Sequence, residues 1–543
     1  MYVCAQFLTG KLSAAYVQGQ QGANETETSY MLAGSCCKHY VAYDVDQKPV
    51  SRVFFDAIVQ TRDFWESYLP AFDACINEGQ ATSLMCSYNS MNGKPTCADP
   101  NLLNGILRDR WNWTGFVMSD YDAWADLVTT HKVCEDFTCA AAMGINAGMD
   151  QEGGGSIAID SMPAAVAAGM VAESTVDEAL RRLMRVRIGL GMLDPPTLVQ
   201  PFNDISNATI ESGAHLAWAR VAAQQSMTLL KNTNATLPLP LVKPTSKSIA
   251  LIGPQWADAD LLTGNYAREP NAPGMVSLID GLLTTLQIDL GSASCQPPQA
   301  GKDYRYEVLQ PGYRTWTVEQ CANLCAAQVD GARCEFYTWL DLWCFLSPNG
   351  RNVTTTAGAL GASCTLSPAP AFEPVTHAFG CPDVECSNDS LFTPALNSIA
   401  NAGTIIVTLG LDGQQEGETR DRSVIELPGM QYQLLAAVAA AASESQSVVC
   451  VLVHGGTFAL QNLLTDCDAI LDAWYPGQRC TPPHNICRAA AENRPPARES
   501  SSQQHALTDS LCCVPRDCDC GCVLRISPQA NRAVLPSLTL SSA

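Results

Sequence analysis

The chain has 543 residues, of which 47% are hydrophobic and 16% are charged. A chain of this length predicts about three or four domains at roughly 150 residues each, and its apolar content excludes wholesale disorder. The formal net charge of −22 argues against nucleic acid as a partner, because the phosphate backbone would repel such a surface.

The first part of the chain alternates between helical and extended patterns. We predict a helix over Asp63–Glu78, begun by Asp63 as its cap, and a strand over Thr82–Ser87. A second helix, Asn101–Arg110, and a second strand, Gly115–Ser119, follow. This alternation indicates a parallel sheet within an α/β domain that we place at residues 1–192.

A second α/β domain is expected after a linker at Pro195-Pro196. We assign 193–245 to the linker and the domain's first helix, Ala217–Lys231, and 246–291 with 371–478 to the domain itself. Its predicted strands are β-branched runs that end in glycine or a turn, a pattern that favours strands over buried helix. They begin at Ile249, Thr404 and Val448.

The composition changes in two other regions. Six cysteines fall within residues 292–370, which predicts a small disulfide-stapled module inserted into the second domain. Residues 479–543 are rich in Cys, Pro and Ser and show no usable periodicity, and they read as an unrelated tail. The tail cysteines match no closed metal site, so we predict no metal and no cofactor. Apolar runs such as Leu434–Ala442 are shorter than the ~20 residues of a membrane span.

The cysteine content indicates an oxidising compartment. The chain has 25 cysteines, many for a cytosolic protein, and six Asn-x-Ser/Thr sequons that agree with an extracellular or secretory-pathway location. Residues 1–7 do not resemble a secretory signal, so we expect the original N-terminus to be absent from this sequence. The sequons begin at Asn24, Asn112, Asn207, Asn234, Asn352 and Asn388.

Asp120 is the most informative residue of the chain. It follows the apolar run Gly115–Ser119, and a carboxylate at the carboxyl end of a buried strand is how a parallel α/β barrel presents a catalytic group. A helix cap in an ordinary strand–helix unit is the simpler alternative. The loop around Glu416 and Glu418 supplies further carboxylates, and a pair of carboxylates is the equipment for breaking a glycosidic bond.

Other polar and aromatic residues lie where strands are expected to end. Lys38 and His39 fit hydrogen bonds to sugar hydroxyls, although a solvated surface pair has the same pattern. Met85 and Tyr88 fit a sugar pocket or a hydrophobic core, and Tyr121 follows Asp120 directly. His131 and His454 read as structural residues.

Several ordered motifs resemble glycoside hydrolase family 3, and most closely its β-xylosidase and α-arabinofuranosidase branch. The similarity extends over about residues 5–290 and 375–478. The motifs are Cys36–Asp44, Met85–Pro95, Gly115–Asp120, Leu229–Asn232, Gly410–Arg422, Leu427–Gly429 and Tyr475–Gln478.

This resemblance implies a (β/α)8-type barrel, here partial, followed by an α/β sandwich. It implies that Asp120 is the nucleophile and that the acid/base is Glu416, with Glu418 as the competing choice. The substrate would be a hemicellulose oligosaccharide or polysaccharide that contributes terminal β-D-xylose or α-L-arabinofuranose. The sugar subsite would be lined by Lys38, His39, Met85, Tyr88 and Tyr121.

The insert resembles a PAN/Apple module, which would bind a protein or glycan ligand. That resemblance implies the pairs Cys295–Cys364, Cys321–Cys344 and Cys325–Cys334, whereas the sequence alone leaves every connectivity open. Family members carry further barrel strands upstream and further sandwich downstream, so we expect a chain truncated at both ends. An inactive fragment that acts only through the PAN-like module is therefore the alternative function.

Overall fold

The computed structural model describes most of the two α/β domains and parts of the backbone of the insert. The described residues are 2–22, 30–198, 205–240, 246–257, 260–266, 276–286, 294–295, 299–303, 313–314, 336–340, 343–347, 354–365 and 374–477. The predicted tail, 479–543, lies outside them.

The N-terminal domain contains a parallel four-stranded sheet, as its alternating pattern predicts. The strands run in the order β1-β3-β6-β7, and each neighbouring pair is parallel. Parallel strands bring their carboxyl ends to one edge, so residues that follow different strands meet there. The strands are β1 Cys36–Tyr40, β3 Ser83–Cys86, β6 Phe116–Tyr121 and β7 Gln151–Gly153.

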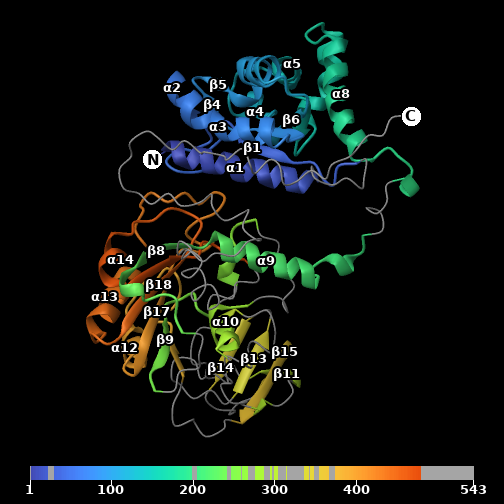
Figure 1. The fold of residues 1–543 in the computed structure, drawn as a ribbon. Coiled ribbons are helices and arrows are strands. Elements are labelled where there is room, and N and C mark those ends of the chain that lie inside the picture. Colours follow the sequence, from blue (N-terminus) through green and yellow to red (C-terminus); the bar gives the residue numbers. More distant parts are fainter. Residues whose placement is uncertain are drawn as a thin grey trace, which may run out of the picture. The chain divides into compact units, whose positions relative to one another are not determined.

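Helices and short strands complete this domain (Figure 1). Its longer helices are α1 Tyr2–Gln21, η4 Asn101–Arg110, α5 Phe137–Ala147 and α8 Glu173–Gly189. Short helices are η3 Thr96–Ala98, α4 Asp126–Thr129, α6 Ile157–Asp160, α7 Met162–Ala167 and η5 Pro196–Leu198. A small sheet is formed by β2 Asp56–Ala57, β4 Ser90–Met91 and β5 Lys94–Pro95.

The predicted helix over Asp63–Glu78 is present, but its start and its cap were predicted wrongly. The helix begins at Thr61 after an extended Gln60, and Asp63 is already helical. Its winding alternates between α and π turns, and Pro70, which has no N–H to donate, lies within it. The segments are α2 Thr61–Asp63, η1 Phe64–Tyr68, α3 Leu69–Asp73 and η2 Ala74–Glu78.

A buried charge cluster fixes the base of β6. The Asp150 carboxylate accepts from Arg108 at 3.0 Å, from Arg182 at 2.7 Å and from the Val117 amide at 2.8 Å. Breaking a buried ionic cluster leaves an unpaired charge and is strongly destabilising. The cluster therefore fixes the strand whose opposite end carries Asp120.

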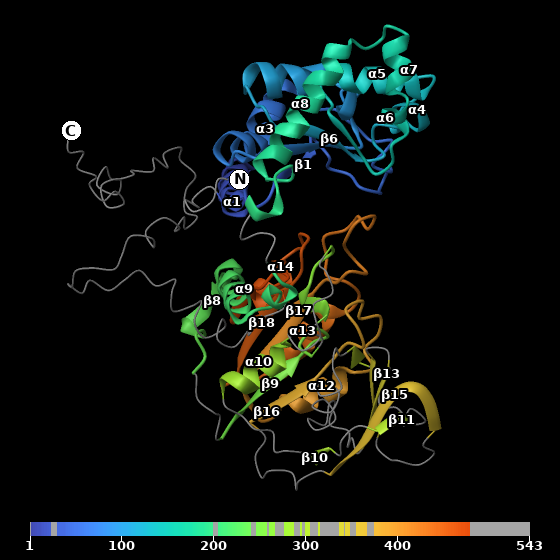
Figure 2. The same ribbon diagram turned by 90° about the vertical axis from the view of Figure 1, so that its right-hand side faces the viewer.

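The second domain is built on a six-stranded sheet with helices on both faces (Figure 2). The order is β16-β9-β17-β18-β19-β8, and all pairs except β19 with β8 are parallel. The predicted strands at 249, 404 and 448 are thus confirmed. The strands are β8 Thr228–Asn232, β9 Ser248–Ile252, β16 Val375–Ala378, β17 Ala402–Gly410, β18 Ser447–Val453 and β19 Ala469–Asp472.

Alternating residues along these strands enter two separate cores. Leu251, Ile406 and Val451 pack on the face that carries α10 Leu278–Thr285. Their neighbours Ile252, Val407 and Leu452 pack with three helices on the other face. Side chains alternate across a strand, so a fully buried sheet needs apolar residues at every position. The three helices are α12 Phe392–Ser398, α13 Gln431–Ala441 and α14 Gln461–Asp466.

The predicted helix over Ala217–Lys231 is only partly correct. The helix α9 spans Gly213–Ser226, and the chain turns extended at Met227 to form β8. Leu229 and Lys231 then pair with β19 and make β8 an edge strand of the sheet, and this tertiary pairing overrides a helix-compatible local pattern. Short turns nearby are η7 Asn207–Thr209, η8 Thr233–Ala235 and η9 Asp260–Leu262.

The insert is described only as backbone strands. The register of β10 with β15 places Cys295 opposite Cys364, and Cys344 lies on β14. Cys321, Cys325 and Cys334 fall outside the described residues, so the three disulfides stay predictions. The strands are β10 Ser294–Cys295, β11 Gln299–Asp303, β12 Tyr313–Arg314, β13 Phe336–Leu340, β14 Trp343–Ser347 and β15 Thr354–Thr365.

Disulfides also occur within both α/β domains, where we made no specific prediction. Cys37 of β1 is joined to Cys75, and Cys450 of β18 is joined to Cys467. Each therefore links a strand to a neighbouring segment of the same domain. The remaining described pairs are Cys86–Cys97, Cys134–Cys139 and Cys381–Cys386.

The end of β17 requires glycine. Gly410 has a φ of 151°, and a Cβ there would lie 1.9 Å from the carbonyl oxygen of Val453. We expect Gly410→Ala to destabilise the fold by about 3 kcal/mol, measured as the shift in urea midpoint, because backbone must move to remove the clash. Gly413→Ala is the matched control, since a Cβ there meets nothing within 4 Å. Equal midpoints for the two variants would contradict this prediction.

Candidate active site

Asp120 lies at the carboxyl end of β6 with a largely buried side chain. Its Oδ1 accepts from the Tyr121 amide at 2.7 Å, and its Oδ2 lies 3.6 Å from Nε2 of His39. Burial raises the pKa of the Tyr88 hydroxyl, and the negative charge of this carboxylate raises it further. Residues from β1, β3 and β6 therefore meet around one carboxylate at the strand ends, as the parallel pattern predicts.

His39 is held in its neutral form. Burial lowers the pKa of His39, and the positive charges of Lys38 and Arg52 lower it further, while the negative charges of Asp120 and Glu418 act in the opposite direction. The net pKa is below the ordinary histidine value of about 6.5. At neutral pH the imidazole is thus a hydrogen-bonding group for a neutral ligand rather than a cation.

Tyr88 and Arg52 form a stacked pair beside Asp120. The Arg52 guanidinium lies 4.5 Å from the centroid of the Tyr88 ring and also donates to Asp46 at 3.0 Å. Burial raises the pKa of the Tyr88 hydroxyl, and the charge of Asp120 raises it further, so Tyr88 remains a proton donor. Arg52 was not predicted, because it lies in an irregular segment after Pro49 that carries none of the motifs.

The other predicted binding residues lie less close to this carboxylate. Lys38 is exposed, and its Nζ lies 5.7 Å from the ring centroid of Tyr266. Met85 is half-buried in β3, opposite Met118 of β6. Tyr121 is 66% exposed and follows Asp120 in the strand, so alternation directs it to the other face of the sheet. The structure does not group Tyr121 with Asp120, although it is adjacent in sequence.

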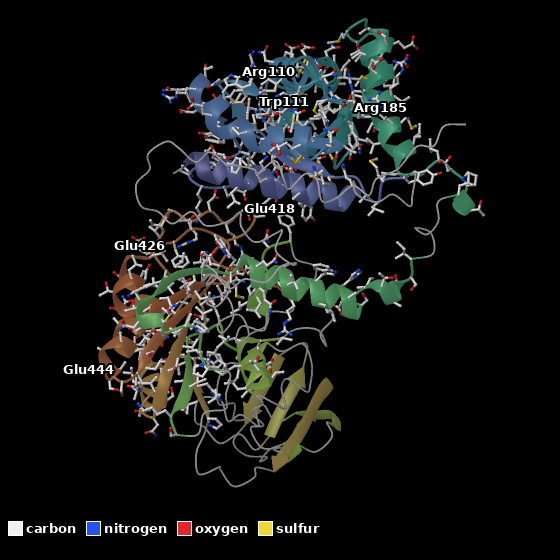
Figure 3. All side chains as sticks on the ribbon, in the orientation of Figure 1. Arg110, Trp111, Arg185, Glu418, Glu426 and Glu444 are labelled. Carbon is white, nitrogen blue, oxygen red and sulfur yellow. A yellow bond between two sulfur atoms is a disulfide. The ribbon has the colours of Figure 1, made fainter. Side chains whose placement is uncertain are left out.

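Glu418 shares its neighbours with Asp120. It accepts from Nη1 of Arg52 at 2.6 Å and from the Tyr266 hydroxyl, and its side chain is 38% exposed (Figure 3). The hydrogen bond from Tyr266, followed by that from Arg52, lowers the pKa of this carboxyl group. The negative charges of Glu418 and Asp120 both act on His39 and Tyr88. The two carboxylates thus belong to one electrostatic cluster.

Glu416 is held in a different way. Its two oxygens accept from the amides of Gly455 and Gly456, each at 2.5 Å, and Oε1 also accepts from the Tyr475 hydroxyl at 2.5 Å. All three donors belong to the second domain. Burial, followed by this bond to Glu416, raises the pKa of Tyr475 well above its ordinary value. The carboxylate of Glu416 is therefore occupied within its own domain.

Asp421 connects the same loop to the segment that carries Arg52. Its Oδ2 accepts from the amides of Asp46, Gln47 and Lys48 at 3.0, 2.6 and 2.9 Å. The Thr419 amide donates in return to Asp46. Partial burial raises the pKa of Asp421, but the three amides outweigh burial, and the net pKa is lowered.

Within the ranges given above, no cluster of three or more His, Cys, Asp or Glu side chains is arranged to hold a metal ion. Within the same ranges, no helix has both the length and the apolarity that a membrane crossing needs.

Models of two known domains match the chain. Residues 4–186 match the glycosyl hydrolase family 3 N-terminal domain, and residues 227–482 match the glycosyl hydrolase family 3 C-terminal domain. Together these matches cover both α/β domains. They agree with the motifs that carry the resemblance.

Named relatives are β-xylosidases. A probable beta-D-xylosidase 7 of Arabidopsis thaliana is 32% identical over 87% of this chain and 50% of its own length. A beta-xylosidase/alpha-L-arabinofuranosidase 2 of Medicago sativa is 29% identical over 87% of this chain and 49% of its own. The chain thus spans about half the length of the curated relatives it matches.

Solved structures show the same fold. An exo-beta-xylosidase in complex with a xylobiose aziridine probe is 23% identical, with a TM-score of 0.65 over 88% of this chain and 50% of the other. A beta-glucosidase from Listeria innocua in complex with glucose is 21% identical, with a TM-score of 0.64 over 89% of this chain and 53% of the other. These likenesses support the partial barrel followed by an α/β sandwich.

We expect Asp421→Asn to loosen the acidic loop, which we define as Gly410–Arg422, and to lower stability by about 1–2 kcal/mol at neutral pH, because charge-assisted hydrogen bonds become neutral ones. The pKa of Asp421 is lowered in the fold, so its contribution is complete above the ordinary carboxyl pKa of about 4. It is lost as the pH falls through the lower folded-state value. Urea unfolding at pH 7 and at pH 3 measures both effects, and a wild-type–variant difference that does not shrink at acidic pH would contradict them.

Proposed function

Because the chain belongs to glycosyl hydrolase family 3, we propose that it is an exo-acting, retaining glycoside hydrolase. Its substrates are xylan or hemicellulose oligosaccharides, from which it releases terminal β-D-xylose and, as a second sugar, α-L-arabinofuranose. The observation that carries the proposal is that two carboxylates, Asp120 and Glu418, lie in one environment. His39 lies 3.6 Å from Asp120, and Arg52 donates to Glu418 at 2.6 Å while its guanidinium stacks on Tyr88. Two carboxylates on either side of one sugar are what double displacement requires.

Asp120 is the nucleophile in this proposal. Its carboxylate attacks the anomeric carbon, the glycosidic bond breaks, and a glycosyl ester forms while an acid protonates the departing oxygen. Water then attacks the ester, and the same acid, now a base, takes its proton. The inversions of the two steps cancel, so the product retains its configuration. For this course the carboxyl groups stand about 5–5.5 Å apart when substrate is bound.

The groups around Asp120 suit a neutral sugar. Neutral His39 both accepts and donates hydrogen bonds, the Tyr88 hydroxyl remains protonated, and exposed Lys38 supplies a further donor. Half-buried Met85 contributes apolar contact with the sugar ring. Tyr121 is retained as a predicted contact for a substrate that extends past the strand end.

Glu418 is the better-supported acid/base. It shares His39 and Tyr88 with Asp120, whereas the carboxylate of Glu416 is taken up by Gly455, Gly456 and Tyr475. In the free protein, Arg52 and Tyr266 hold Glu418 ionised. The role therefore requires that bound sugar displace one of these donors and exclude water, since both changes raise a carboxyl pKa.

The sugar class and the location rest on further observations. Relatives are named for xylosides and arabinofuranosides, which supports the pentose substrate. The described disulfides and the sequons support a secretory-pathway or extracellular location. The family match covers both α/β domains, so the hydrolase is favoured over a fragment that acts through its insert alone.

We expect Asp120→Asn to lose about 10³-fold or more in kcat/KM on 4-nitrophenyl β-D-xyloside, because an amide cannot serve as the nucleophile. Release of 4-nitrophenol measures the loss. Asp122→Asn is the matched control: Asp122 has a φ of 58°, which asparagine tolerates, and its carboxylate accepts from Gly155 rather than facing His39. Full activity in the Asp120 variant would reject the nucleophile assignment.

The roles of the two glutamates can be distinguished by how the activity loss of each variant depends on the leaving group of the substrate. Glu418→Gln is expected to lose about 10²–10³-fold on xylobiose but much less on 2,4-dinitrophenyl xyloside, whose leaving group needs no proton. Azide should restore activity on the activated substrate by replacing base-assisted water. Glu416→Gln is expected to show a smaller loss without azide rescue. The reverse pattern would move the acid/base role to Glu416.

A further inference from the structure

A buried histidine–aspartate pair lies next to the turn whose amides bind Glu416. His454 follows β18, and Asp472 ends β19. Their side chains are 6% and 10% exposed, and Nε2 of His454 lies 3.0 Å from Oδ1 of Asp472. The His454 ring also packs edge-on against Phe458, with ring centroids 4.5 Å apart. The pair is thus buried at the end of two parallel strands.

The second ring nitrogen of His454 holds a turn. Nδ1 lies 2.7 Å from the carbonyl oxygen of Gly456, which only accepts, so Nδ1 carries a proton and donates. The amides of Gly455 and Gly456 in the same turn donate to Glu416. The same turn therefore accepts a hydrogen bond from His454 and donates two to Glu416 of the acidic loop.

The same pair holds the other segment that binds Glu416. Oδ1 of Asp472 accepts from the Trp474 amide at 3.3 Å, and the His454 amide donates to the Trp474 carbonyl at 3.3 Å. The next residue, Tyr475, donates its hydroxyl to Glu416. All three donors to Glu416 thus lie on segments that His454 and Asp472 hold.

The turn at Gly455–Gly456 lies so close to Glu416 and Tyr475 that it has little room to move. A Cβ on Gly456 would lie 2.3 Å from Oε2 of Glu416, and one on Gly455 would lie 2.8 Å from the Tyr475 ring. A small displacement of this turn therefore either breaks the bonds to Glu416 or moves the loop. Misplacing a catalytic group by about 1 Å is enough to cost roughly 10²-fold in rate.

We propose that the His454–Asp472 pair is a positioning device for the acidic loop Gly410–Arg422 and acts through the turn at Gly455–Gly456 and through Glu416. The proposal rests on the proposed function in one respect: the loop carries the proton donor, Glu418. His454 and Asp472 touch no substrate in this proposal. They set where the loop lies.

Two substitutions of His454 test its bonds to Gly456 and to Asp472 one at a time. In His454→Asn the amide nitrogen occupies the place of Nδ1 and keeps the bond to Gly456, whereas in His454→Gln it occupies the place of Nε2 and keeps the bond to Asp472. Amide hydrogen exchange of the full chain, followed by mass spectrometry, reports the loop directly and needs no turnover. We expect exchange in peptides spanning 410–422 to rise about tenfold or more in the Gln variant and clearly less in the Asn variant.

Peptides from β17 and β18 are the internal reference. His377→Asn is the matched control, because His377 lies on β16 of the same domain and stacks on Trp256 at a centroid distance of 4.8 Å. Exchange that rises equally in the loop and in these strands, or that stays unchanged in the loop, overturns the proposal.

A kinetic comparison tests the consequence for catalysis. The Gln variant should lose about tenfold more kcat on xylobiose than on 2,4-dinitrophenyl xyloside, since a misplaced proton donor affects only the poorer leaving group. Equal losses on both substrates would overturn the link to proton donation. A wild-type chain that cleaves neither substrate would instead reject the proposed function, and the exchange experiment would still decide whether the pair positions the loop.

Discussion

The binding of carboxylates by backbone amides fixes the candidate site. Glu416 takes two amides from the turn at Gly455–Gly456, and Asp421 takes three from residues 46–48. Hydrogen bonds to an ionised acceptor are stronger than neutral ones, and backbone donors cost little side-chain entropy. The loop between these two carboxylates is thereby held at both ends. Glu418 lies between them and is the carboxylate that reaches Arg52.

Each partner of this loop depends on a parallel sheet. The turn at Gly455–Gly456 follows β18, and Asp120 lies next to the last residue of β6. The carboxyl ends of parallel strands gather at one edge, where loops receive functional side chains without disturbing the core. The ionic cluster on Asp150 and the two cores of the second sheet keep those edges in place. Packing thus keeps in place the strand ends on which the polar groups of the site lie.

The sequence predicts this framework well because burial leaves a local signal. Runs such as Ile249–Ile252 and Val448–Val453 are apolar at every position, since both faces of their sheet are covered. The apolar run Gly115–Ser119 likewise predicts a buried strand, and Asp120 follows this run directly. By contrast, Thr228–Lys231 was assigned to a helix, because its pairing with β19 is a long-range contact that no local pattern reveals.

The site itself is only partly visible in the sequence. His39, Tyr88 and Asp120 come together as predicted, because each follows or ends a strand of one sheet. Arg52 was missed because its partners, Tyr88 and Glu418, are far away in the chain. His454 was taken as structural, which its burial supports. Its bond to Gly456 depends on a turn geometry that residue types alone do not specify.

The choice between Glu416 and Glu418 shows why the fold is needed to assign roles. The two residues are two positions apart in one loop, so no spacing argument ranks them. The surroundings differ in kind: Glu416 meets three donors from its own domain, and Glu418 meets Arg52, which stacks on a neighbour of Asp120. A carboxylate saturated by fixed amides is a poor proton shuttle but a good anchor. A carboxylate held by side chains can exchange them for a sugar through rotamer changes alone, and that difference favours Glu418 as the proton donor and Glu416 as its support.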